Sequence, residues 1–340
     1  MTVTLISKED LIKRGLIKVE GPPPTPAERH SPRPKSKKQA GLRPKPIMDG
    51  EKKAPLVDIC CNLTAFKEEK ISAVLKRAAE AGVTHIIVTG TTYNNSKRAL
   101  RICETFDRTE GIVLRCTIGI HPCDVFSTLF KVDEETKEVR RTKLGETYEA
   151  ALENLVKSDL GRRYCVAIGE CGLDYNRSAE HAQYQRPVFA NHLKLAHKVN
   201  LPVLLHCRDA HMDFMKILRA WMGVLKVVDQ CHTDPSVKNL KELLAGGCYI
   251  GLTGIVTDER DGRFNPDVAA EIPEDRLMVE TDAPYLFPRN TPNSMRSGCR
   301  NNEPCLLPYV VKKISHLTDR PEREIAHSST EVAKGFFKLS

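Results

Sequence analysis

The stretch Cys165-Val-Ala-Ile-Gly-Glu-Cys-Gly-Leu-Asp174 is an apolar run that ends in two carboxylates. Strands that are buried on both faces of a parallel sheet consist of nearly continuous aliphatic residues, and Cys165–Gly169 fits that pattern. The sequence therefore predicts buried parallel strands here and wherever the pattern recurs. Seven other runs of the same kind lie at Leu56–Cys60, His85–Thr89, Leu114–Ile118, Pro202–His206, Lys226–Gln230, Cys248–Leu252 and Leu277–Thr281.

Apolar residues at helical spacing separate many of these runs and follow the last of them. The starts of successive runs lie 22 to 51 residues apart, which is close to the length of one β-strand with its helix. Eight such units in alternation predict an α/β protein with a (β/α)₈ TIM barrel over residues 55–340. The helical patterns lie at residues 71–78, 99–106, 214–221, 237–244, 306–317 and 321–337.

The first 54 residues differ in composition from the rest of the chain. Residues 21–46 contain eight prolines, and residues 1–53 hold 13 Lys and Arg against 6 Asp and Glu. The whole chain carries a net charge of +8, so the remaining residues are nearly neutral. A segment with so little apolar surface cannot offset the chain entropy lost on folding. We therefore predict a basic leader over residues 1–54, disordered from about residue 20 onward.

The composition also excludes several classes of protein. No apolar run approaches the roughly 20 residues that span a bilayer, and the N-terminus lacks the apolar core of a signal peptide. The twelve cysteines form no CxxC pair, and inside cells buried free thiols are the expected state. The sequence predicts an intracellular protein of the cytoplasm, the nucleus or both, with no disulfides and no contact with membranes.

Ionisable side chains lie at the ends of the predicted strands, where barrels of this kind carry their active sites. Glu170, His206, His232 and Asp282 follow four different runs. Two histidines with two carboxylates form a ligand set for a divalent metal in a hydrolase. Such a metal activates water and polarises the bond to be cleaved, and Glu170 would bridge two ions if two bind. Arg208 lies two residues beyond His206, where its guanidinium could hold a phosphate.

Several motifs, in order along residues 55 to about 338, resemble those of the TatD family of metal-dependent deoxyribonucleases. They are Ala167–Asp174, Leu205–Ala210, Gly251–Gly254 and Val279–Tyr285, together with Asp58–Thr64, Gly119–Pro122 and Arg300–Pro304. The resemblance implies a TIM barrel of the amidohydrolase-like superfamily and a magnesium-dependent nuclease. Members are typically 3′→5′ exonucleases on single-stranded DNA and sometimes RNA, with links to DNA repair and to DNA fragmentation in cell death.

Carried over motif by motif, the resemblance implies roles for single residues. The four strand-end residues would bind one or two metal ions. The metal would be Mg²⁺, with Mn²⁺ or Zn²⁺ as alternatives. Asp282 would hold or deprotonate the attacking water, and Glu170 would act in catalysis as a metal ligand. His121 and Arg208 would contact the substrate phosphate or the second coordination shell of the metal. The residues that bind the substrate would be Arg208, Asn62 and Glu303.

The first predicted strand departs from the pattern of many relatives. They carry His-x-His where this chain has Cys60 and Asn62, although one branch of the family has Gly and Asn there. A thiolate at Cys60 would favour a metal softer than magnesium, whereas a buried thiol would act as a small apolar side chain. The number of metal ions therefore stays open at this stage.

Two other functions compete with DNA hydrolysis. The nearly neutral barrel also suits a metal-dependent amide or ester hydrolase of the same superfamily, because a fold does not fix its substrate. A non-catalytic nucleic-acid-binding protein could instead use the basic leader, which would attract phosphates without sequence preference or serve as a nuclear-import signal. The sequence predicts a monomer and leaves open the polarity of cleavage, the choice of DNA or RNA, the role of the leader and the pathway.

Overall fold

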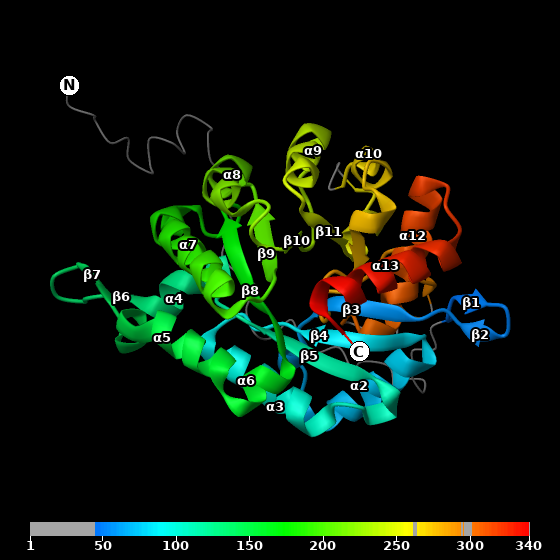
Figure 1. Ribbon diagram of the computed structural model, residues 1–340, viewed down its shortest axis with the longest axis horizontal. Coiled ribbons are helices and arrows are strands. Elements are labelled where there is room, and N and C mark those ends of the chain that lie inside the picture. Colours follow the sequence, from blue (N-terminus) through cyan, green and yellow to red (C-terminus); the bar gives the residue numbers. More distant parts are fainter. Residues whose placement is uncertain (1–44, 261–263, 294, 296–300, 340) are drawn as a thin grey trace, which may run out of the picture. The chain divides into compact units, whose positions relative to one another are not determined.

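The computed structural model describes residues 45–260, 264–293, 295 and 301–339. Its centre is a sheet of eight parallel strands that neighbour one another in chain order (Figure 1). All eight overlap the predicted runs, so the predicted barrel class is confirmed. The strands are β3 (Leu56–Cys61), β4 (Val83–Val88), β5 (Val113–Ile118), β8 (Cys165–Asp174), β9 (Val203–Arg208), β10 (Val227–Asp229), β11 (Tyr249–Leu252) and β12 (Leu277–Val279).

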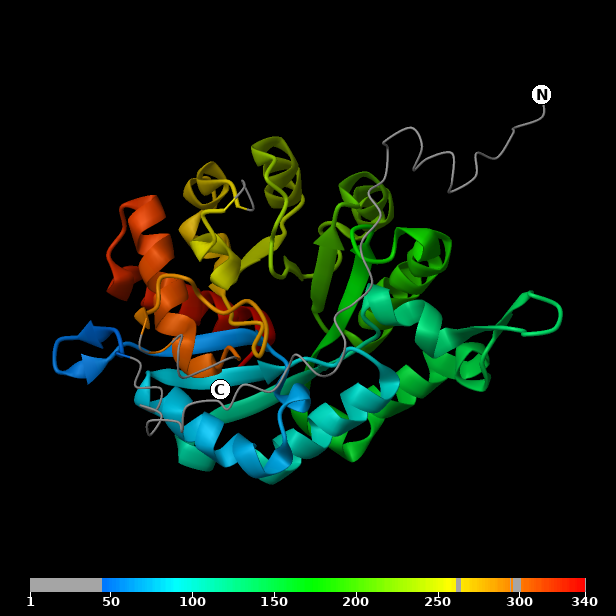
Figure 2. The same ribbon diagram turned by 180° about the vertical axis from the view of Figure 1, so that it is seen from behind.

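Helices cover the outer side of these strands, as the two opposite views in Figure 1 and Figure 2 show. Side-chain oxygens cap the N-termini of several helices. At the start of α3, for example, the Thr92 hydroxyl accepts a hydrogen bond from the backbone N–H of Asn95 at 3.1 Å. Each predicted helical pattern overlaps one of the described helices. They are α2 (Glu68–Glu80), α3 (Tyr93–Phe106), α4 (Val125–Leu129), α5 (Lys143–Lys157), α6 (Asp159–Tyr164), α7 (Ala182–Val199), α8 (His211–Leu218), α9 (Val237–Ala245), α10 (Pro266–Ala270), α12 (Leu307–Thr318) and α13 (Glu322–Phe337).

The first and last strands of the sheet come together just beyond the end of β12, which nearly closes the barrel. The backbone N–H of Asp282 donates to the carbonyl of Cys60 at 2.9 Å. Beside this contact, the fully buried carboxylate of Asp58 accepts from the Thr281 backbone N–H at 2.9 Å and from its hydroxyl at 2.5 Å. Asp58 therefore takes part in joining the two edges of the sheet.

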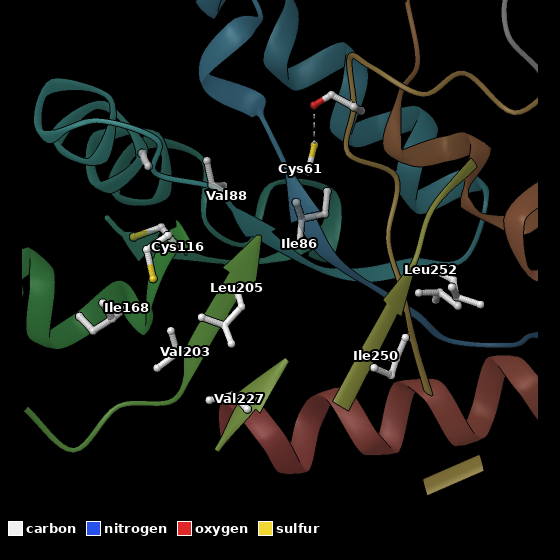
Figure 3. Packing of buried hydrophobic residues seen from close by; sticks show 14 of the residues in the cluster. Cys61, Ile86, Val88, Cys116, Ile168, Val203, Leu205, Val227, Ile250 and Leu252 are labelled. Atoms are coloured by element: carbon white, nitrogen blue, oxygen red, sulfur yellow. Dashed lines mark hydrogen bonds between the residues drawn. The ribbon is translucent and has the colours of Figure 1, made fainter. Parts of the chain in front are cut away.

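Apolar side chains fill both faces of the strands. On β9, Leu204 belongs to an inner cluster, whereas Val203 and Leu205 pack in the outer core between sheet and helices (Figure 3). Helix α13 adds Phe336 and Phe337 to the inner cluster. This double burial explains why the strand sequences are apolar throughout. The other inner residues are Val57, Ile59, Cys60, Ile87, Ala167, Val228, Met278 and Ala333.

Two short hairpins lie outside the predictions. One pairs β6 (Phe130–Val132) with β7 (Val139–Arg141). The other pairs β1 (Met48–Asp49) with β2 (Lys52–Lys53) and falls within the predicted leader. Ile47 is buried there and its carbonyl accepts from the backbone N–H of Ala54 at 2.8 Å. Part of the predicted leader thus has local structure, and the division of the chain at residue 54 stays a prediction. Residues 1–44 of that leader lie outside the described residues.

No described helix combines the length and the apolar character that a membrane crossing requires.

Candidate metal centre and active site

His121, Glu170 and His206 form a compact group at the carboxyl ends of three adjacent strands, β5, β8 and β9. They offer potential ligand atoms that all lie within 4.8 Å of one another. Glu170 Oε1 is 3.1 Å from His206 Nδ1 and 3.4 Å from His121 Nε2. All three residues are buried. Burial of a charged group costs free energy unless the group is paired or binds a cation.

The backbone of β8 turns the Glu170 side chain toward this group. The pairing of β8 with β9 is irregular between Ile168 and Cys171. Gly169, within this irregular segment, has a φ of +136°, and a Cβ there would collide with the carbonyl of Leu204. Glycine at this position therefore permits the close approach of two strands beside Glu170.

Asp174, at the end of β8, orients His206 from the other side. Asp174 Oδ2 accepts from His206 Nε2 at 3.1 Å. Burial acts to lower the pKa of His206, but its hydrogen bonds to Asp174 and Glu170 outweigh burial and raise that pKa to about 9. Burial likewise acts to raise the pKa of Asp174, and hydrogen bonds from His206 and Arg177 hold it well below its usual range. A fixed carboxylate–histidine pair of this kind orients metal-binding imidazoles in many proteins.

His232 is held through one ring nitrogen and leaves the other without a described partner. Its Nδ1 lies 2.7 Å from Asp229 Oδ2, which fixes the proton on that nitrogen. Its Nε2 is buried and has no hydrogen-bond partner among the described residues. Nearby, Gln230 Nε2 donates to Glu170 Oε1 at 2.6 Å, which links the end of β10 to the group around Glu170. The bare, buried Nε2 of His232 suits a metal ligand.

Asp282 follows β12 and is joined to the first strand by Asn62, whose Nδ2 donates to Asp282 Oδ1 at 2.8 Å. Burial and the charge of Glu170 raise the pKa of Asp282 to about 8. Burial also raises the pKa of Glu280, whose Oε2 has no partner among the described residues. The mouth of the barrel therefore holds more buried carboxylates than its own cations offset, and a divalent cation would relieve that imbalance.

Cys60 is fully buried in the inner cluster. Its Sγ lies 3.1 Å from the hydroxyl of Thr89 and 4.0 Å from Asp282 Oδ1. Burial, with the charges of Glu280 and Asp282, raises the pKa of the Cys60 thiol well above its usual value. Cys60 is therefore a neutral thiol packed among apolar side chains.

The predicted substrate-binding residues have different surroundings. Arg208 shares one face of β9 with His206, and within the described residues its guanidinium has no hydrogen-bond or ion-pair partner. Glu303 is engaged by Arg77 of α2, whose Nε and Nη2 donate to it at 2.7 and 2.9 Å. The described contacts thus join Glu303 to the helix layer, and its role in binding substrate stays a prediction.

Four residues of this site were absent from the predicted set. Asp174 could have been identified from the sequence, because it ends the same apolar run as Glu170. Asp229 lies three residues before His232, but a buried strand end gives no sign that it faces that ring. Neither Gln230 nor Arg177 follows from the sequence, because their partners are known only from the folded chain.

Comparisons with known proteins agree on one family. The family model for TatD related DNases matches residues 57–338. The 3′-5′ ssDNA/RNA exonuclease TatD of Erwinia tasmaniensis is 37% identical over 287 residues, which cover 84% of this chain and 100% of that protein. The protein of the same name from Dickeya dadantii is 35% identical over 286 residues, with 83% and 98% covered.

Solved structures give the same result. A hydrolase TatD family protein from Entamoeba histolytica superposes with a TM-score of 0.68 at 25% identity, covering 83% of this chain and 97% of the other. A TatD homolog from Escherichia coli k12 gives the same TM-score and identity, with 84% and 99% covered. The family-model match over residues 57–338 includes every residue of the site described above.

Proposed function

This chain belongs to the TatD-related DNase family, and from that premise we propose that it is a metal-dependent nuclease that hydrolyses phosphodiester bonds. We propose single-stranded DNA or RNA as the substrate and removal of nucleotides from the 3′ end, as the names of its relatives indicate. The observation that carries the proposal is the buried group of His121, Glu170 and His206 at the ends of neighbouring strands.

The residues present fit a divalent cation. The buried Nε2 of His232 has no partner among the described residues, while Asp229 holds the other ring nitrogen. We propose that the ion is Mg²⁺ and that one ion is held firmly, because Cys60 is a buried thiol where a second histidine would be needed. The proposed ligands are Glu170, His206, His232 and Asp282.

When bound, the ion would lower the pKa of a water molecule and polarise the phosphoryl group. Asp282, whose Oδ1 is held by Asn62, would accept the proton of the attacking water at its other oxygen. His121 has a different part. The backbone N–H of Cys123 donates to His121 Nδ1 at 3.1 Å, so neutral His121 carries its proton on Nε2 and would donate it in a hydrogen bond to the phosphate.

The test uses purified full-length protein, Mg²⁺ and single-stranded DNA or RNA labelled at the 5′ end. The wild type should shorten the labelled strand one nucleotide at a time. Glu170→Gln should reduce cleavage by at least about a hundredfold, and isothermal titration should show weaker Mg²⁺ binding. Glu331→Gln is the matched control, because Glu331 is 71% exposed on α13.

Full cleavage by Glu170→Gln would overturn the assignment of the site. Absence of nuclease activity in the wild type, combined with metal-dependent cleavage of amides or esters, would replace the proposed substrate by that of the alternative hydrolase. The monomeric state and the intracellular location stay predictions, which light scattering and cell fractionation would test.

A further inference from the structure

Arg177 lies in the turn that follows β8 and is held there by Asp174. Asp174 Oδ1 accepts from the Arg177 backbone N–H at 2.7 Å, and Asp174 Oδ2 accepts from Arg177 Nε at 2.8 Å. The Arg177 side chain is nevertheless 51% exposed, whereas that of Asp174 is fully buried. The guanidinium is thus fixed along one edge and open to solvent along the other.

The open edge of Arg177 faces His121. Arg177 Nη2 lies 3.3 Å from His121 Nε2. His121 Nδ1 accepts from the Cys123 backbone N–H, so Nε2 carries a proton in the neutral ring and in the charged ring alike. Two donors cannot bond to each other, and no described residue offers an acceptor to Arg177 Nη2. His121 Nε2 also lies 3.4 Å from Glu170 Oε1, whereas the Arg177 guanidinium, half exposed and beside it, is available to an anionic oxygen.

We propose that Arg177 binds a non-bridging oxygen of the phosphate that is cleaved, together with His121 Nε2. This inference rests on the proposed nuclease function. The guanidinium fork matches phosphate oxygens in shape and charge. Because Asp174 already holds the side chain in place, little further side-chain entropy is lost when the substrate binds.

Arg208 is the natural comparison, because the register of the sheet pairs it with Asp174 across β8 and β9. Its guanidinium lacks the anchor that Asp174 gives to Arg177 and has no described partner. We therefore assign the cleaved phosphate to Arg177. Arg208 would then contact another phosphate of the bound nucleic acid.

The experiment compares Arg177→Gln with the wild type on two single-stranded oligonucleotides that resist hydrolysis. One carries a phosphorothioate, which is charged, at its 3′-terminal linkage, and the other carries an uncharged methylphosphonate there. With Mg²⁺ present, Arg177→Gln should weaken binding of the phosphorothioate about tenfold or more. The slope of log Kd against log salt concentration should fall by about 0.7, the value for one phosphate contact on a single strand. The wild type and Arg177→Gln should bind the methylphosphonate oligonucleotide with the same Kd.

Arg177→Lys separates charge from shape. The slope of log Kd against log salt concentration should stay the same, because lysine keeps the positive charge. The value of kcat/KM on unmodified DNA should still fall, because lysine lacks the forked guanidinium group. Arg162→Gln is the matched control, since Arg162 forms an ion pair with Asp159 at the same i,i+3 spacing on the exposed helix α6. It should leave binding and cleavage unchanged, and thermal unfolding should show that all variants are folded.

Two negative results have different meanings. If the wild type cleaves DNA but Arg177→Gln keeps wild-type binding of the phosphorothioate and wild-type kcat/KM, the role of Arg177 is refuted and the nuclease function stands. Equal losses on the phosphorothioate and the methylphosphonate would also refute the phosphate contact. If the wild type neither binds nor cleaves nucleic acid, the proposed function itself fails.

Discussion

His192 should contribute to the stability of this protein at neutral pH and lose that contribution in mild acid. It lies on α7, is 1% exposed, and joins that helix to the segment that precedes His121. Its Nδ1 lies 2.7 Å from the carbonyl of Val188, and its Nε2 accepts from the backbone N–H of Ile120 at 3.1 Å. Both ring nitrogens are used only by the neutral form with its proton on Nδ1. Protonation of Nε2 would set two donors against each other.

The magnitude follows from the pKa of His192, which burial lowers from 6.5 to about 4. Between these two values the unfolded chain takes up a proton and the folded protein does not. The contribution to stability is therefore complete above pH 6.5 and is lost as the pH falls toward 4. Each pH unit corresponds to 1.36 kcal/mol, so the contribution of His192 to the free energy of unfolding should fall by about 3 kcal/mol over this range.

The assay is urea unfolding of the wild type and His192→Gln in EDTA at several pH values between 7 and 4. Glutamine does not titrate, so the stability difference between the two proteins should shrink by about 3 kcal/mol as the pH falls. Leu193→Ala is the matched control, because Leu193 is the next residue on α7, is fully buried and cannot titrate. Its difference from the wild type should not depend on pH. A constant difference for His192→Gln would refute the reasoning.

Three further substitutions test single contacts. Asp58→Ala should cost about 3 kcal/mol of stability, measured by urea unfolding, because the Thr281 N–H and hydroxyl lose their buried acceptor; a cost below 1 kcal/mol would contradict this. Glu303→Gln should lower the free energy of unfolding by about 1 kcal/mol, because it removes the ion pair with Arg77. It should leave kcat/KM on DNA nearly unchanged. A tenfold loss of kcat/KM would instead support the predicted role of Glu303 in binding substrate. Cys60→Ala should leave the metal content of the purified protein unchanged, because a buried neutral thiol is a poor ligand, and loss of the metal would show that Cys60 binds it.

The strands could be predicted from the sequence because a barrel buries both of their faces. On β9, Leu204 points into the barrel and Leu205 into the helix layer, so each position along the run must be apolar. The two short hairpins follow no such rule. Val132 and Val139 of the β6–β7 hairpin are 49% and 40% exposed, so burial imposes no pattern on them.

The positions of the site residues could be predicted more fully than their contacts. Glu170 and His206 could be assigned to one site because each lies at the end of a predicted strand. In contrast, the ion pair of Glu303 with Arg77 joins residues 226 positions apart, and nothing near either residue in the sequence indicates the other. Arg177 shows the same limit at short range, because its position near His121 depends on the turn that Asp174 fixes.

The charges of the barrel also bear on how it could bind a polyanion. Residues 54–340 carry 39 Lys and Arg against 38 Asp and Glu, so the barrel has almost no net charge with which to attract DNA over long distances. At its mouth, ionised Glu170 would repel a phosphate, whereas burial and the charge of Glu170 raise the pKa of Asp282 to about 8. A bound divalent cation would reverse this local charge. Metal and nucleic acid should therefore each raise the affinity of the barrel for the other, and titration of single-stranded DNA with and without Mg²⁺ would measure that coupling directly.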